Sequence, residues 1–256
     1  MEELFLTWFL VFVRAGALLS VFPIFSAAAV PVRLRIMLAG LLAFLVMPTV
    51  GLPPDFPRSG LLEMTLVIFK EVSMGLLLGF LSRLVMFSAA LAGHYVGNEI
   101  GLQLGGMIAP GESAPSEVPG VILQLLATML LLALDIHLAI IAGFQQSYSV
   151  LPIGGGILSN GLFDLMTAKV SHAFLVAVKI AAPVLAVGVV LNLLMMILAR
   201  AVPQMNVFAE SFSIRVVVGL FLFGSVLSLA SHELSNYLGS VPEDFIVMAR
   251  WLGVGD

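Results

Sequence analysis

Six apolar runs, each long enough to cross the hydrocarbon core of a bilayer, constrain this chain more than any other feature. They are Leu4–Phe22, Leu34–Val50, Leu61–Gly97, Val121–Tyr148, Phe163–Ala201 and Phe212–Leu238. A membrane-spanning helix needs about 20 apolar residues. With 61% hydrophobic and only 10% charged residues, the chain departs far from the composition of soluble domains. The sequence therefore predicts an all-α, membrane-associated protein built from about six long hydrophobic helices.

Two of these runs are longer than one crossing requires. As helices, Leu61–Gly97 and Phe163–Ala201 would each extend roughly 50 Å or more, against a hydrocarbon thickness of about 30 Å. We expect them to tilt, to kink or to leave the membrane. Gly75, Gly79 and Pro183 are the expected bending points.

Charged side chains inside or at the margins of the runs are the second anomaly. The main ones are Arg14, Lys70, Glu71, Arg83, Glu99, Asp135 and Lys179. A charge at the centre of a membrane helix costs at least about 2.5–3.5 kcal/mol, so these groups are not expected to face lipid. Lys70 and Glu71 are adjacent and lie about 100° apart on a helix, so they do not pair with each other. We expect the partners of these charges on other helices or on other protein chains.

The sequence gives no support for an enzyme, a metal site or a cofactor site. There is no cysteine, and the four histidines lie on separate runs with no helical ligand spacing. The closing "GVGD" resembles an intramembrane aspartyl protease motif but lacks the second facing aspartate. Net charge is −4 and the basic residues are scattered, which excludes nucleic acid as a partner.

The stretch "GLQLGGMIAPGESAPSEVPG", residues 101–120, interrupts the apolar pattern with glycine, proline and small polar residues and contains no Lys or Arg. It divides a single-domain chain into N-terminal helices (1–100), this segment (101–120), C-terminal helices (121–241) and a tail (242–256). The tail has apolar residues at helical spacing and is expected to form an interfacial amphipathic helix. From the residues alone, 101–120 is a water-exposed connection.

Several phrases, in order and spacing, resemble the FliR family of flagellar export proteins, whose counterpart in virulence type III secretion is the export-apparatus T subunit. They are "IGLQLGG" (100–106), "IHLAII" (136–141), "LPIGGG" (151–156), "LNLLMMILARAVPQMNVF" (191–208) and "SIRVVVGL" (213–220). The resemblance spans nearly the whole chain. Its most specific positions, expected to form subunit contacts, are Gly101, Gln103, Pro203, Gln204, Met205, Asn206 and Phe208.

The resemblance implies a core subunit of a helical protein export gate. Its partners would be FliP-like and FliQ-like gate subunits, FlhB-like and FlhA-like subunits, membrane lipids and unfolded export substrates in transit. The implied location is the bacterial inner membrane within the flagellar basal body, with part of the complex raised toward the periplasm. The charges inside the apolar runs would then lie at subunit interfaces.

The resemblance also implies that the segment after Gly101 folds inward and plugs the closed channel. The implied plug residues are Gly105, Gly106, Met107, Ile108, Ala109, Pro110 and Gly111. Glycines permit unusual backbone conformations, and methionine makes a deformable apolar seal. With the family taken into account, we favour a plug over a plain loop.

Two other functions stay open at this point. The same family features would suit the export gate of a virulence secretion system, although "PQMNVF" favours the flagellar one. A secondary transporter for a small solute is the alternative from another class; such a protein is expected to show related halves and to work alone.

Overall fold

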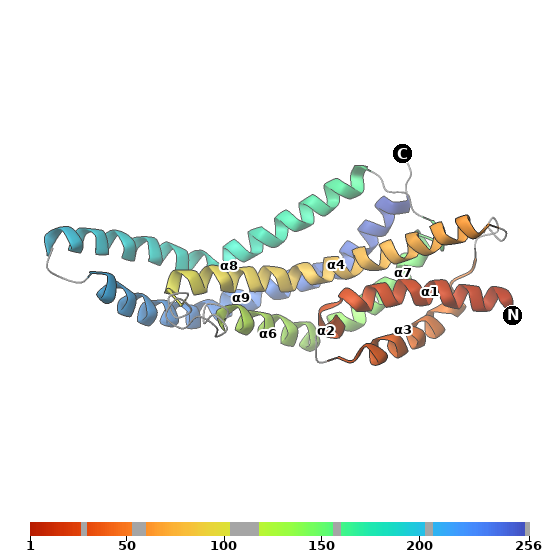
Figure 1. Ribbon diagram of the computed structural model, residues 1–256, viewed down its shortest axis with the longest axis horizontal. Coiled ribbons are helices and arrows are strands. Elements are labelled where there is room, and N and C mark those ends of the chain that lie inside the picture. The colour runs from red at the N-terminus through yellow and green to blue at the C-terminus, as the bar shows by residue number, and fades with distance from the viewer. Residues whose placement is uncertain (27–29, 53–59, 103–117, 156–159, 203–206, 254–256) are drawn as a thin grey trace. The chain divides into compact units, whose positions relative to one another are not determined.

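The computed structural model describes residues 1–26, 30–52, 60–102, 118–155, 160–202 and 207–253, and these residues form helices joined by short connections. The long helices are α1 (Glu2–Val21), α3 (Val32–Val46), α4 (Leu61–Ile100), α6 (Val118–Ala133), α7 (Ile136–Val150), α8 (Asn160–Ala201) and α9 (Val207–Gly253). The short ones are α2 (Pro23–Ser26) and the 3-10 turn η1 (Met47–Thr49). The expected all-α fold is confirmed (Figure 1).

Among the described residues, five helices are long and apolar enough to span a membrane, and α6 with α7 makes a sixth if the pair counts as one bent span. This agrees with the predicted six apolar runs. Helices α4, α8 and α9 contain 40, 42 and 47 residues, which corresponds to about 60–70 Å each. Helix α8 continues through Pro183 without interruption.

The fourth predicted run is not one helix. It breaks between α6 and α7, whose axes differ by 68°. Asp135 stands at the break with a φ of 54°, a left-handed conformation that aspartate tolerates better than most residues. The charged residue thus ends α6 and begins α7 instead of lying within a span.

The predicted separate tail helix is also wrong in one respect, because residues 242–253 are the end of α9. Pro242 lies inside that helix. The apolar face of the tail does not form an interface with lipid, since Phe245, Met248 and Ala249 are fully buried within the protein.

The chain forms two compact units, each assembled from separate stretches. Unit 1 consists of Met1–Leu84, Leu131–Val170 and Leu238–Asp256, and unit 2 consists of Val85–Leu130 and Ser171–Tyr237. Helices α4, α6, α8 and α9 contribute residues to both units.

In unit 1, α1 buries one stripe of side chains, which includes Leu10, Arg14 and Leu18 at helical spacing. Helix α3 lies alongside α1 (Figure 1) and turns only small or medium residues inward, such as Ala39 and Ala43. The larger residues of α3 point outward and leave an apolar face exposed.

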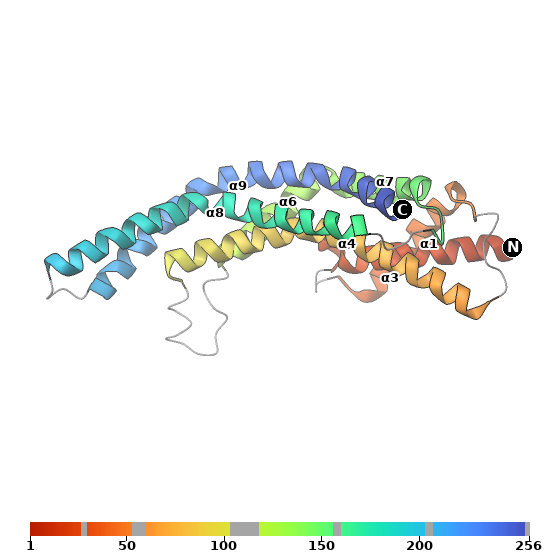
Figure 2. The same cartoon turned by 90° about the horizontal axis from the view of Figure 1, so that it is seen from above.

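In unit 2, the later part of α8 and the first part of α9 lie side by side (Figure 2). Alanines on both helices, among them Ala177, Ala181 and Ala230, are completely buried. An edge-to-face contact between His172 and Tyr237, with ring centroids 4.8 Å apart, joins the two helices. Small residues therefore set the packing distance in this unit.

Candidate functional site

A buried ion pair joins α1 to α4 in unit 1. Arg14 donates from Nε to Glu71 Oε2 over 2.6 Å and from Nη2 to Glu71 Oε1 over 3.0 Å. Each side chain is only 1% exposed. Two-point contacts of this kind combine charge with fixed geometry, and a buried charge needs such a partner. The pair therefore fixes how α1 lies on α4.

A third helix completes the surroundings of Arg14. The guanidinium carbon lies 3.9 Å from the ring centre of Tyr148 on α7, a cation–π distance. Nη1 also makes long contacts to Ser147 Oγ at 3.4 Å and to the carbonyl oxygen of Leu151 at 3.5 Å. One side chain thus links α1, α4 and α7.

Two adjacent residues of α4 hold the turn that follows α7. Glu71 Oε1 accepts a hydrogen bond from the backbone N–H of Gly154 over 2.9 Å, and Lys70 Nζ donates to the carbonyl of Gly154 over 3.2 Å. The φ of Gly154 is +74°, in the region that favours glycine. As expected, Lys70 and Glu71 do not pair with each other. The positive φ also gives a structural reason for the glycine at position 154 in the "LPIGGG" phrase.

Glycines bring α4 into direct contact with α1. A Cβ placed on Gly75 would overlap the carbonyl oxygen of Arg14, and one on Gly79 would lie 2.8 Å from Cβ of Val21. The Gly-x-x-x-Gly spacing on α4 therefore serves close helix packing, next to the buried ion pair.

In unit 2, α4 and α6, the helices before and after the segment 103–117, pack against each other through glycines. A Cβ on Gly93 of α4 would overlap the backbone of Gly120 near the start of α6. The two helices therefore touch backbone to backbone at this crossing. Helix α4 ends at Ile100, seven residues after Gly93, so it extends about 10 Å past the crossing.

The end of α4 is held against α9. Ile100 is 1% exposed and its side chain fills the space where a Cβ of Gly219 would lie, 2.6 Å from that position. Gly101 has a φ of +87°, and a Cβ there would meet the ring of Phe212 at 3.6 Å. The chain thus enters the segment from a fixed helix end and leaves it at the fixed Gly93–Gly120 contact.

Glu99 packs its carboxyl group against α8. A Cβ on Gly188 would overlap Glu99 Oε1, so the carboxyl group occupies the space that a side chain at position 188 would fill. This oxygen is buried and accepts no hydrogen bond from the residues that the structure describes.

The other charges expected at subunit interfaces lie at the surface of their units. Arg83 and Asp135 are exposed, and Lys179 is paired with Glu233 over 3.7 Å. Arg14 and Glu71 differ from these, because each is buried in unit 1 and is the partner of the other. For the exposed charges, the place at subunit interfaces stays a prediction.

Several predicted site residues lie outside the described part of the chain. These are Gly105–Gly111 of the plug and Gln103, Pro203, Gln204, Met205 and Asn206 of the family motif. Phe208 belongs to α9, but its side chain is outside the described residues too.

The sequence reasoning missed two residues of the buried cluster, Ser147 and Tyr148. Both belong to "QQSYS", a polar stretch at the end of an otherwise apolar helix, which was the available signal. Among the described residues, no three His, Asp or Glu side chains gather where they could bind a metal ion.

Known proteins match this chain over most of its length. The family model for bacterial export proteins, family 1, matches residues 5–241. The flagellar biosynthetic protein FliR of Caulobacter vibrioides is 30% identical over 86% of this chain and 87% of its own length. The proteins of the same description from Escherichia coli K12 and Bacillus subtilis 168 are 29% and 28% identical. These two alignments cover 89% and 98% of this chain, and 88% and 98% of the relatives.

Proposed function

Because this chain belongs to the FliR family of bacterial export proteins, we propose that it is a channel-forming subunit of the flagellar protein export gate. It acts in flagellar protein export, it is a membrane protein of the flagellar apparatus, and it is not an enzyme. The observation that carries the proposal is the family match, which covers residues 5–241 and so includes most of both units and the segment between Gly101 and Gly120. Its proposed location is the bacterial inner membrane, with part of the complex raised toward the periplasm.

The proposed gate contains FliP-like and FliQ-like subunits around this chain, with FlhB-like and FlhA-like subunits in the same apparatus. Exposed apolar side chains on the later part of α8 support the need for neighbours. Val189, Leu193, Met196 and Ile197 are each more than half exposed. Lipid and neighbouring subunits would together cover this apolar surface.

Within the gate, residues 105–111 are proposed to close the channel. The support from the described residues is the packing of the two helices that precede and follow this segment. The Gly93–Gly120 contact and the packing of Ile100 on α9 hold both ends, so a change within the segment need not disturb unit 2. The segment also contains no Lys or Arg, so closing the channel would not strand a strongly hydrated cation in a narrow bore.

Removing residues 105–115 tests the plug. We expect cells that make the shortened protein to show higher membrane conductance to ions, since the closed channel would lack its seal. The control is assembly: the shortened chain must still copurify with FliP-like and FliQ-like subunits. An assembled complex with unchanged conductance would make 103–117 a plain connection, and a chain that never copurifies with other apparatus subunits would refute the gate itself.

A further inference from the structure

The end of α4 packs on glycines of both α8 and α9 in unit 2. The carboxyl group of Glu99 fills the space beside Gly188 of α8. The side chain of Ile100 fills the space beside Gly219 of α9. Interlocking side chains are what normally fix the axial position of packed helices, and neither glycine supplies one. The packing therefore holds the helices close together without preventing a shift of α8 and α9 along the end of α4.

A guanidinium group lies one turn further along the same surface. Arg215 of α9 donates from Nη2 to Asn192 Oδ1 of α8. Asn192 follows Gly188 by four residues and Arg215 precedes Gly219 by four residues. Each therefore lies on the helix face that contacts the end of α4. Because α8 and α9 run in opposite directions (Figure 1), both positions lie one turn beyond that end.

Two ionic groups of this region each have a buried atom without a hydrogen-bond partner. Among the described residues, Glu99 Oε1 accepts no hydrogen bond and Arg215 Nε donates none. Leaving buried charged groups unmatched is unfavourable. One atom is an acceptor, the other is a donor, and the two side chains have opposite charge. Each is therefore the partner that the other lacks, and direct pairing would satisfy both.

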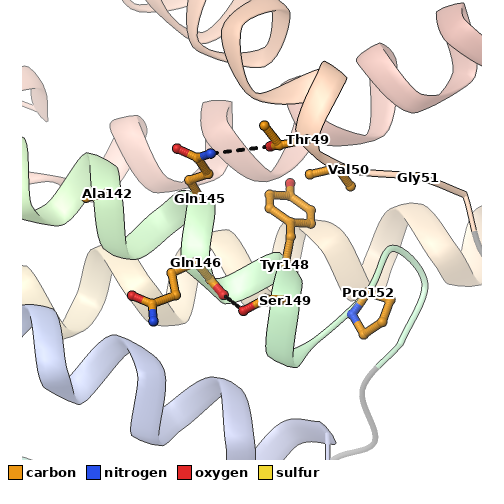
Figure 3. A pocket seen from close by; sticks show the side chains of 9 residues that line it. All are labelled: Thr49, Val50, Gly51, Ala142, Gln145, Gln146, Tyr148, Ser149 and Pro152. Atoms are coloured by element: carbon orange, nitrogen blue, oxygen red, sulfur yellow. Dashed lines mark hydrogen bonds between the residues drawn. The ribbon is translucent and has the colours of Figure 1, made fainter.

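An unmatched polar atom in unit 1 has no such complement. The Tyr148 hydroxyl makes no hydrogen bond to the described residues, and Figure 3 shows it pointing toward the apolar side chain of Val50. Its ring is held against Arg14. Of these two regions, only the end of α4 combines an unmatched acceptor with an unmatched donor of opposite charge.

We propose that the end of α4 and the α8–α9 pair form a latch with two positions. In the structure, Glu99 lies against Gly188 and Arg215 binds Asn192. In the second position, the α8–α9 pair is shifted along α4 by up to one turn, about 6 Å, and Glu99 replaces Asn192 as the partner of Arg215. Shifts of one helical turn between two packed arrangements are an established form of switching. The proposal rests on the proposed function, since the second position would be used during protein export.

A disulfide between α4 and α9 tests whether their contact must change. The chain contains no cysteine, and a Cβ on Gly219 would lie 3.3 Å from Cβ of Ile100, close to the spacing of bonded cysteines. The full chain carries Ile100→Cys with Gly219→Cys in cells, and each single variant is the control. We expect oxidation to abolish export of flagellar proteins in the double variant only, and a reductant to restore it. Undiminished export with the disulfide formed would overturn the latch.

Two further substitutions distinguish a latch from a fixed packing contact, and they do not depend on export by the cysteine variant. Each is read as the rate of disulfide formation between positions 100 and 219 in the purified export complex. Asn192→Ala removes the partner of Arg215 in the first position, so we expect the rate to fall by about 3–10-fold. Arg215→Gln removes the attraction toward the second position, so we expect the rate to be unchanged or higher. An unchanged rate in Asn192→Ala, or equal losses in both variants, would refute the latch.

Copurification is scored in the same samples. A chain that stays alone overturns the gate and the latch together. A complete complex that still exports with the disulfide formed overturns the latch only.

Discussion

Unit 1 and unit 2 bring apolar helices together in different ways. Unit 1 buries Arg14 and Glu71 as a pair, whereas no charged side chain among the described residues of unit 2 is fully buried. Close glycine contacts occur in both units, at Gly75 against Arg14 in unit 1 and at Gly93 against Gly120 in unit 2, but only unit 1 adds a buried ion pair to them.

The difference has a physical consequence. An ion pair with two hydrogen bonds is directional, so it specifies both the rotation and the axial position of the helices that carry it. A glycine contact specifies only that no side chain stands between two backbones. We therefore expect loss of a buried charge to affect unit 1 alone, whereas added volume at a glycine contact affects either unit.

The largest effect is expected from Glu71→Gln. It leaves the buried Arg14 cation without its counter-charge, which costs about 3–5 kcal/mol. We expect a clearly lower apparent melting temperature of the purified export complex and reduced swimming motility.

The double variant Arg14→Met, Glu71→Met is the control for this change. It removes both charges, and apolar replacement of a buried pair is often close to neutral. Most of the lost thermal stability is therefore expected to return. Equal stability of Glu71→Gln and the unaltered chain would show that charge pairing does not distinguish unit 1.

Added volume in unit 2 is expected to have the next largest effect. Gly93→Ala places a Cβ on the backbone of Gly120, and overpacking of this kind costs about 1–3 kcal/mol. The melting temperature of the complex and the export of flagellar proteins should both fall.

Gly224→Ala is the matched control, because no heavy atom lies within 4 Å of the added Cβ. In a helix this change is expected to stabilise by roughly 0.5–1 kcal/mol. If the two alanine variants behave alike, the Gly93–Gly120 contact is not what holds α4 on α6.

The sequence alone could predict the helices, one close glycine contact and the charged residues that need a partner. Hydropathy alone located the apolar runs, and the Gly75-x-x-x-Gly79 spacing indicated close packing. The cost of a charge in an apolar run marked Arg14 and Glu71. Their mutual pairing could not be predicted, since they are 57 residues apart and their meeting depends on the packing of α1 on α4.

Two errors have similar origins. No proline or glycine marks the break between α6 and α7, so the left-handed turn at Asp135 was hidden in a continuous apolar run. The tail beyond Pro242 has an amphipathic pattern, but such a pattern does not tell whether its apolar face meets lipid or protein. In the structure Phe245 lies 3.5 Å from the position of a Cβ on Gly143 in α7, so the partner is protein.

The smallest effects are expected from the remaining lysines, and they sharpen the comparison within one helix. On α8, Lys169 of unit 1 is 25% exposed and lies 2.5 Å from Asp244, which is 11% exposed. Lys179 of unit 2 is 54% exposed and lies 3.7 Å from Glu233, which is 22% exposed.

Lys169→Met leaves a mostly buried carboxylate without its donor and is expected to cost about 1–2 kcal/mol, whereas Lys179→Met is expected to change stability by less than about 0.5 kcal/mol. Both are measured as melting temperatures of the same complex at low and high salt, and only the Lys169 effect should persist in high salt. Equal losses in the two variants would mean that charge pairing matters in unit 2 as well, and the contrast between the units would fail.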